Sequence, residues 1–216
     1  MIDRRRLLLA SAATPLLGLS PALADGTRGF RRFRILRDGS DIGTHELTAT
    51  RSGDRFEIAI DIDIRVRLLG ITAYRYMLEN REVWDGGVLT SIDSKTDDDG
   101  EDNYARITRA GDQLEVDGSA YSGTAPLESV TTSYYARPFM DRRPWISTQT
   151  GKPLDVAVDP VADAPRTFGV SGDLDIVLIY DANSEWVGCR FDAGGEPGVY
   201  EMVENEGSIG GLWQSA

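Results

Sequence analysis

The side chains that most often carry out chemistry are scarce in this sequence. His45 is the only histidine and Cys189 the only cysteine, so one chain cannot assemble a zinc site of the ordinary His/Cys type. A serine hydrolase would have His45 as its only candidate base, and the chain lacks the Gly-x-Ser-x-Gly motif. We therefore predict no catalytic residue, no metal ligand and no cofactor. His45 alternates with Thr44 and Glu46 in a strand-like run, and we expect it to be hydrogen-bonded or to face solvent.

An acidic run at residues 97–102 offers the carboxylate oxygens that Ca²⁺ prefers. Its spacing does not fit an EF-hand loop. Placing Gly100 at the sixth position puts Lys95 at the first and Arg106 at the twelfth, where carboxylates are required. We interpret the run as a solvated hairpin tip.

Aromatic and polar side chains share one face of the segment 71–84. Its even positions are Tyr74, Tyr76, Leu78, Asn80, Glu82 and Trp84, and alternate residues of a strand point the same way. Polar groups in an aromatic-lined hollow are typical of a ligand site, although a strand end in solvent would also explain them. We predict ligand-binding residues here and in the neighbouring segments: Ile60, Ile62, Ile64, Tyr74, Tyr76, Asn80, Glu82, Trp84, Tyr134, Arg137 and Trp145.

Arginines and aromatic residues also gather at 134–145. Such side chains together bind carboxylates, phosphates or sugars in many proteins, but they also close the open ends of barrels. We favour the structural interpretation for most of this group, which comprises Tyr134, Tyr135, Arg137, Phe139, Arg142, Arg143 and Trp145.

The elements that must position these residues are strands. Residues 56–68 carry an apolar side chain at every second position, with mostly charged residues between, which is the period of a strand. At about 3.3 Å per residue the run spans roughly 40 Å, about twice the usual strand, and so long a strand twists and curls with its sheet. A curled sheet has a concave face that can hold a ligand.

Short turns rich in Asp and Gly separate the strand-like runs, which indicates consecutive antiparallel hairpins. The predicted fold class is all-β with one short helix: a strongly curled antiparallel sheet, or half-barrel, of about 10–12 strands. The helix is expected at 124–135, followed by an ordered loop over 136–153. We expect a single β domain over 25–206 and a flexible, Gly-rich tail over 207–216.

The first 24 residues have the pattern of an export signal. Arg4, Arg5 and Arg6 precede an apolar run from Leu7 to Leu19, and Ala22–Ala24 ends in the small-x-small pattern of a cleavage site. We expect cleavage after Ala24, a periplasmic location and the twin-arginine route. The apolar run is too short and too interrupted for a membrane anchor, so we expect no transmembrane segment in the mature chain.

The mature chain would be strongly acidic. Removing residues 1–24 lowers Lys+Arg from 23 to 20 and Asp+Glu from 35 to 34, so the net charge changes from −12 to −14. Such a surface repels phosphate backbones, and we expect no nucleic-acid partner.

Several runs resemble a known family. They include residues 33–36, Ile42–Gly43, 74–76, 82–86 and 148–156. The chain resembles a proteobacterial family of exported proteins of unknown function, which is similar in architecture to the curled-sheet carriers of the Lol lipoprotein pathway. The resemblance implies a one-sided half-barrel with a short helical lid and a lipid or other amphipathic ligand.

The sequence therefore predicts a periplasmic, non-enzymatic binding or envelope-maintenance protein whose concave face holds an apolar or amphipathic molecule. Two alternatives stay open. One is an enzyme that acts on envelope glycans or small exported metabolites through carboxylates such as Glu82 or Asp85. The other is a purely structural protein with an unknown protein partner.

Overall fold

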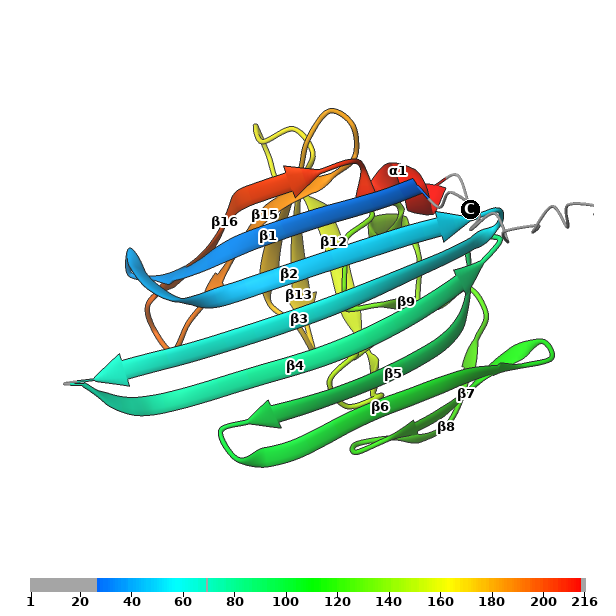
Figure 1. Cartoon of the computed structure of the whole chain (residues 1–216), viewed down its shortest axis with the longest axis horizontal. Helices are drawn as coiled ribbons and strands as arrows, with labels where there is room; N and C mark the ends of the chain where they lie inside the picture. Colours follow the sequence, from blue (N-terminus) through cyan, green and yellow to red (C-terminus); the bar gives the residue numbers. More distant parts are fainter. Residues whose placement is uncertain (1–26, 69, 215–216) are drawn as a thin grey trace, which may run out of the picture.

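The computed structural model describes residues 27–68 and 70–214, and a single large antiparallel sheet dominates them (Figure 1). The sheet has 13 strands in the order β12-β13-β14-β15-β16-β1-β2-β3-β4-β5-β6-β7-β8. In chain order, the first eight strands of this sheet are β1 (Thr27–Arg37), β2 (Ser40–Ser52), β3 (Arg55–Leu68), β4 (Ile71–Asp85), β5 (Val88–Asp98), β6 (Glu101–Ala110), β7 (Gln113–Gly118) and β8 (Ser122–Pro126). The others are β12 (Val156–Pro160), β13 (Thr167–Gly172), β14 (Ile176–Tyr180), β15 (Trp186–Asp192) and β16 (Pro197–Glu206).

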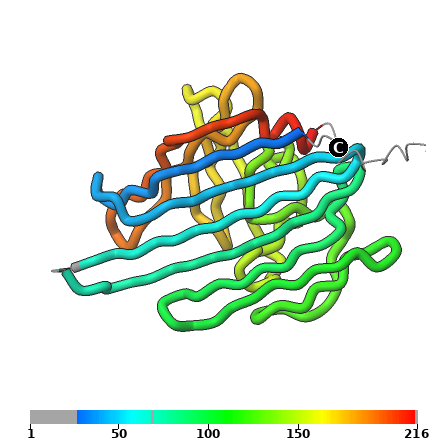
Figure 2. The backbone as a smooth tube through the Cα atoms, viewed as in Figure 1, coloured from blue at the N-terminus to red at the C-terminus, as the bar shows by residue number. Residues whose placement is uncertain are grey.

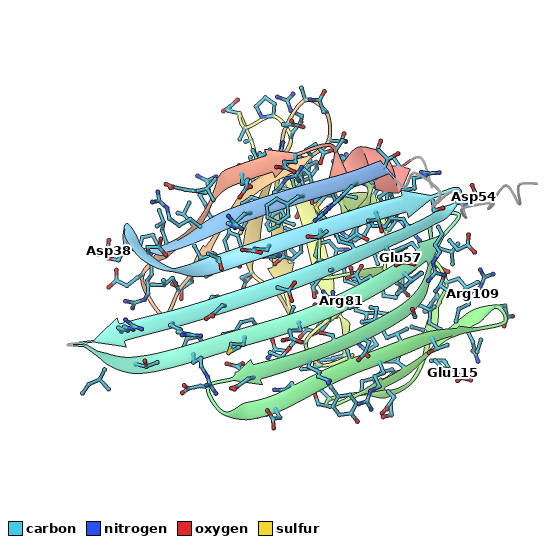
Figure 3. All side chains as sticks on the ribbon, viewed as in Figure 1. Asp38, Asp54, Glu57, Arg81, Arg109 and Glu115 are labelled. Atoms are coloured by element: carbon cyan, nitrogen blue, oxygen red, sulfur yellow. The ribbon has the colours of Figure 1, made fainter. Side chains whose placement is uncertain are left out.

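The alternation in the sequence sets the two faces of the sheet. In β3, Phe56, Ile58 and Ile60 are buried on the concave face. Glu57 of β3 and Arg81 of β4 are exposed on the outer face, where Figure 3 labels them. The edge strands β12 and β8 do not pair with each other, so the sheet curls without closing. The predicted fold class, an open, curled antiparallel sheet with one short helix, is confirmed.

A connecting segment, residues 127–155, occupies the concave face and is called the inner segment below. It contains a small sheet of β9 (Val130–Thr131), β10 (Trp145–Ile146) and β11 (Pro153–Leu154), and the 3₁₀ helix η1 (Arg137–Asp141). Figure 2 shows this part of the chain behind the long strands. Tyr135 lies 5.7 Å from Phe56 and Phe139 lies 5.4 Å from Trp84, measured between ring centroids. The aromatic residues of this segment therefore fill the interior of the curl and do not only close its end.

The helix predicted at 124–135 is wrong. Residues up to Pro126 belong to β8, and after a turn Val130 and Thr131 pair in parallel with Trp145 and Ile146. The β-branched side chains of Val130 and Thr131 suit this extended conformation, and the pairing with β10 stabilises it.

The short helix of the fold lies at the C-terminal end instead, as α1 (Ile209–Gln214). The expectation of a flexible tail is wrong for residues 209–214, because Ile209, Leu212 and Trp213 are buried. Glu185 holds the start of the helix by accepting hydrogen bonds from the backbone N–H groups of Gly210 (3.0 Å) and Gly211 (3.2 Å).

The predicted export signal lies outside the described residues. Among the residues that are described, no helix is long and apolar enough to cross a membrane.

Candidate ligand-binding site

A cavity of about 710 Å³, called the outer cavity below, lies where β3 and β4 extend past the inner segment. Ile58 and Ile60 are buried by that segment, whereas Ile62, Ile64 and Val66, further along β3, are only partly buried. β3 and β4 are the two longest of the described strands, with 14 and 15 residues, and inward-facing side chains at the end of β3 and the start of β4 line this cavity. The lining consists of Arg37, Ile42, Ile62, Ile64, Val66, Arg67, Ala73, Tyr74, Tyr76, Tyr134, Phe191, Asp192, Ala193, Gly194 and Tyr200.

A smaller cavity of about 280 Å³, called the inner cavity below, lies deeper between the sheet and the inner segment. It shares Ile62, Tyr76 and Tyr134 with the outer cavity, so the two adjoin at these side chains. Its wall is richer in polar groups. The lining consists of His45, Ile60, Ile62, Tyr76, Leu78, Asn80, Thr132, Ser133, Tyr134, Ser147, Thr148, Gln149, Leu154, Asp173 and Leu174.

His45 is the most unusual residue of the inner cavity. It is only 3% exposed, and neither ring nitrogen has a hydrogen-bond partner among the described residues. The rings of Trp186 and Tyr200 lie 5.3 and 5.5 Å away, between centroids. Burial lowers the pKa of His45 to about 3, so the imidazole is neutral at pH 7. The expectation that His45 is hydrogen-bonded or faces solvent is wrong, because its strand position turns it into the aromatic interior.

Asn80 lines the same cavity. Its Nδ2 donates to Glu82 Oε1 at 2.9 Å, and since a carboxylate oxygen only accepts here, this bond fixes the orientation of the amide. Asn80 Oδ1 is buried and has no partner within the described part of the chain. Two residues of the inner cavity, His45 on β2 and Asn80 on β4, thus carry unpaired polar atoms.

Glu82 is saturated with hydrogen bonds and lines neither cavity. Its carboxylate accepts from the indole of Trp84 (3.0 Å) and the hydroxyls of Thr131 (3.3 Å), Tyr135 (3.3 Å) and Ser133, in addition to Asn80. Burial raises the pKa of Glu82, and the bonds from Ser133, Asn80, Trp84 and Thr131 oppose that rise. Glu82 is 1% exposed and ties β4 to the inner segment, which is a structural role.

Seven of the residues predicted to bind a ligand lie together along the two cavities. They are Ile60, Ile62, Ile64, Tyr74, Tyr76, Asn80 and Tyr134. Four others lie elsewhere: Glu82 and Trp84 are buried in the core, Trp145 donates its indole N–H to the carbonyl of Phe139 (3.2 Å), and Arg137 pairs with Asp141 over the ring of Phe168.

Sequence reasoning missed several residues of the lining. Phe191 and Tyr200 come from C-terminal strands whose alternation could have placed them on the concave face. Residues 147–149 of the inner segment carry no periodic signal that could have revealed their position. His45 gave a signal only through the buried Leu47 and Ala49, which follow it on the same face of β2.

The charges differ between the two cavities. Arg37, Arg67 and Asp192 lie at the outer cavity, and the Arg37 Nε donates to the carbonyl of Ala193 at 2.7 Å. The inner cavity has one charged residue in its lining, Asp173, which pairs with Lys152 at 3.1 Å. Over the ranges that the structure describes, no group of His, Cys, Asp and Glu side chains could hold a metal ion.

The fold and the two cavities define this protein as a β-barrel-like protein with an open sheet. A crystal structure of a beta-barrel-like protein of DUF1849, a domain of unknown function, from Brucella abortus has a similar fold, with a TM-score of 0.52. The match covers 84% of this chain and 97% of the other at 10% sequence identity, so it shows the fold alone. Residues 33–203 match the family model of DUF6134, a domain of unknown function, and the chain belongs to that family. No curated protein matches the chain.

Proposed function

We propose that this protein is a periplasmic, non-enzymatic binding protein that holds an apolar or amphipathic molecule in the concave face of its sheet. The observation that supports this most strongly is the outer cavity, with a volume of about 710 Å³ in the range of small-molecule sites. Its wall combines aliphatic side chains such as Ile42, Ile64 and Val66 with the rings of Tyr74 and Tyr200.

The physical reason is the partial exposure of these side chains. Ile62, Ile64 and Val66 would each lose contact with water on binding an apolar ligand, which favours binding by about 25 cal/mol for each Å² of apolar surface removed from water. The cavity lies within a sheet that the inner segment already stiffens, so binding needs little rearrangement of the backbone.

The periplasmic location and the likeness to Lol carriers are parts of this proposal. Both come from the sequence, while the comparisons support the coarser class, a β-barrel-like protein of unknown function.

No specific observation favours the alternative of a carboxylate-dependent enzyme. Glu82 accepts five hydrogen bonds and lies outside both cavities, and Asp85 is exposed at the end of β4. The two carboxylates that the alternative would use therefore do not converge on a substrate site.

The experiment that tests the proposal is native mass spectrometry of protein purified from a periplasm, followed by organic extraction of bound molecules. We expect a copurifying apolar or amphipathic molecule, and binding of the apolar dye N-phenylnaphthylamine by the extracted protein. The substitution Ile64→Arg places a charge in the outer cavity and should abolish dye binding, whereas Thr50→Arg adds the same charge at an exposed position of β2 and should not. The absence of both a copurifying molecule and dye binding would reject the proposal.

A further inference from the structure

We infer that the inner cavity recognises an uncharged hydroxyl or amide group at one end of a ligand whose apolar body occupies the outer cavity. This inference rests on the proposed function and specifies the class of its ligand. The two unpartnered nitrogens of His45 and the unpartnered oxygen of Asn80 are the observations that carry it.

The three atoms define a hydrogen-bonding pattern. A neutral imidazole has one N–H donor and one nitrogen acceptor, and Asn80 Oδ1 is a further acceptor because its Nδ2 is held by Glu82. A hydroxyl group both donates and accepts, so it can pair with either side of the imidazole or donate to Asn80. An amide offers the same combination. Buried polar atoms in folded proteins are almost always paired, which makes this unpaired set a reason to expect a polar ligand group.

The surrounding charges exclude other head groups. A carboxylate or phosphate would lie in a cavity to which no Arg or Lys contributes among the described residues, close to Asp173 and to the carboxylate that holds Asn80. Burying an anion without a cation is strongly unfavourable. A quaternary ammonium has no N–H donor and no acceptor, so it would leave His45 and Asn80 unpaired.

The position of His45 links the two cavities. His45 pairs in register with Ile62, which lines both cavities together with Tyr76 and Tyr134. A ligand whose polar end reaches His45 therefore has its next atoms at these three side chains and its remaining apolar part among Ile64, Val66 and Tyr200. The geometry defines a neutral amphiphile that enters with its polar end first.

The test compares three probes with similar chains, each measured by displacement of N-phenylnaphthylamine: 1-monooleoylglycerol, which has two hydroxyls, oleate, which has a carboxylate, and octadecene, which has no polar head. We expect the wild type to bind monooleoylglycerol at least about tenfold more tightly than either other probe. His45→Phe keeps a ring but removes both nitrogens, and it should abolish this preference while the affinity for octadecene stays unchanged.

A spectroscopic measurement keeps the inference testable if His45→Phe does not fold. Because His45 is the only histidine, ¹⁵N-histidine labelling of the untagged protein gives the signals of one imidazole. These signals should shift on addition of monooleoylglycerol and stay in place with octadecene.

The outcomes separate the two proposals. Octadecene binding without a preference for monooleoylglycerol, a preference for oleate, or an imidazole signal that monooleoylglycerol does not shift would overturn the inference and leave the proposed function standing. If no probe displaces bound dye from folded wild-type protein, the inference alone is overturned. If the dye does not bind and no molecule copurifies, both are overturned.

Discussion

The guanidinium of Arg31 lies 2.6 Å from the carboxylate of Glu185, and the two side chains form a buried ion pair between β1 and the start of β15. Arg31 also donates to the carbonyl of Trp186 at 2.8 Å, while Glu185 accepts bonds from the first turn of α1. The pair therefore joins the first strand, a late strand and the C-terminal helix.

Replacing Glu185 with Gln should destabilise the protein by about 3 kcal/mol, because it leaves the Arg31 charge buried without its counterion and weakens the anchor of α1. Urea unfolding followed by tryptophan fluorescence measures the change. Glu201→Gln is the matched control, since Glu201 forms a pair of the same length with Arg34 on the surface and should affect stability little. Equal effects of the two substitutions would contradict the structural role of the buried pair.

His45 should make folding sensitive to acid. Its pKa falls from 6.5 to about 3 on burial, so the unfolded chain binds a proton in this range that the folded chain does not. Its contribution is complete above pH 6.5 and is lost as the pH falls towards 3, by up to about 5 kcal/mol.

The free energy of unfolding, measured between pH 7 and pH 4 for the wild type and for His45→Phe, isolates this contribution from the carboxylates, which both proteins share. The wild type should lose more stability than the variant over this range. Parallel curves would show that the imidazole is protonated in the folded protein as readily as in the unfolded chain.

A side chain at Gly118 should destabilise the protein. A Cβ at this position of β7 would lie 2.3 Å from the carbonyl oxygen of Thr150, a backbone atom of the inner segment. We expect Gly118→Ala to destabilise the protein by about 1–3 kcal/mol, because the segment must move away from the sheet.

Gly169→Ala is the control in β13, where the nearest atom to an added Cβ is 3.9 Å away. Thermal unfolding should show a lower midpoint for Gly118→Ala than for Gly169→Ala. An unchanged midpoint for both would mean that the inner segment is not held closely against β7.

The strands were predictable because their signals are local. Turns such as Asp85–Gly86 and the two-residue period of 56–68 need no distant partner to be recognised, and the structure has strands on both sides of them. The inner segment was not predictable in this way. Val130 is extended because it pairs with Trp145, and the Ser133 hydroxyl donates to Glu82, a residue 51 positions earlier in the chain.

The candidate site likewise has one part that local sequence signals predicted and another part that they did not. The even face of β3 and β4 was predicted to line a hollow, and Ile62, Ile64 and Tyr76 do line the cavities. His45 and Asn80 line one cavity only when β2, β3 and β4 are placed side by side, and the expected role of Glu82 changed once five donors were found around it. Periodicity identifies a face, whereas the pairing of polar atoms depends on tertiary contacts.

The neighbouring positions of β1 and β16 also determine when this chain can finish folding. Phe30 pairs with Glu206 and Arg37 with Gly198, so the middle of the sheet is completed by its last strand. While β16 is still inside the ribosome, the nascent chain would expose the unpaired backbone edge of β1, which is a template for aggregation. Completion of the native sheet must therefore wait until β16 has left the ribosome, and so many long-range pairings make it slow.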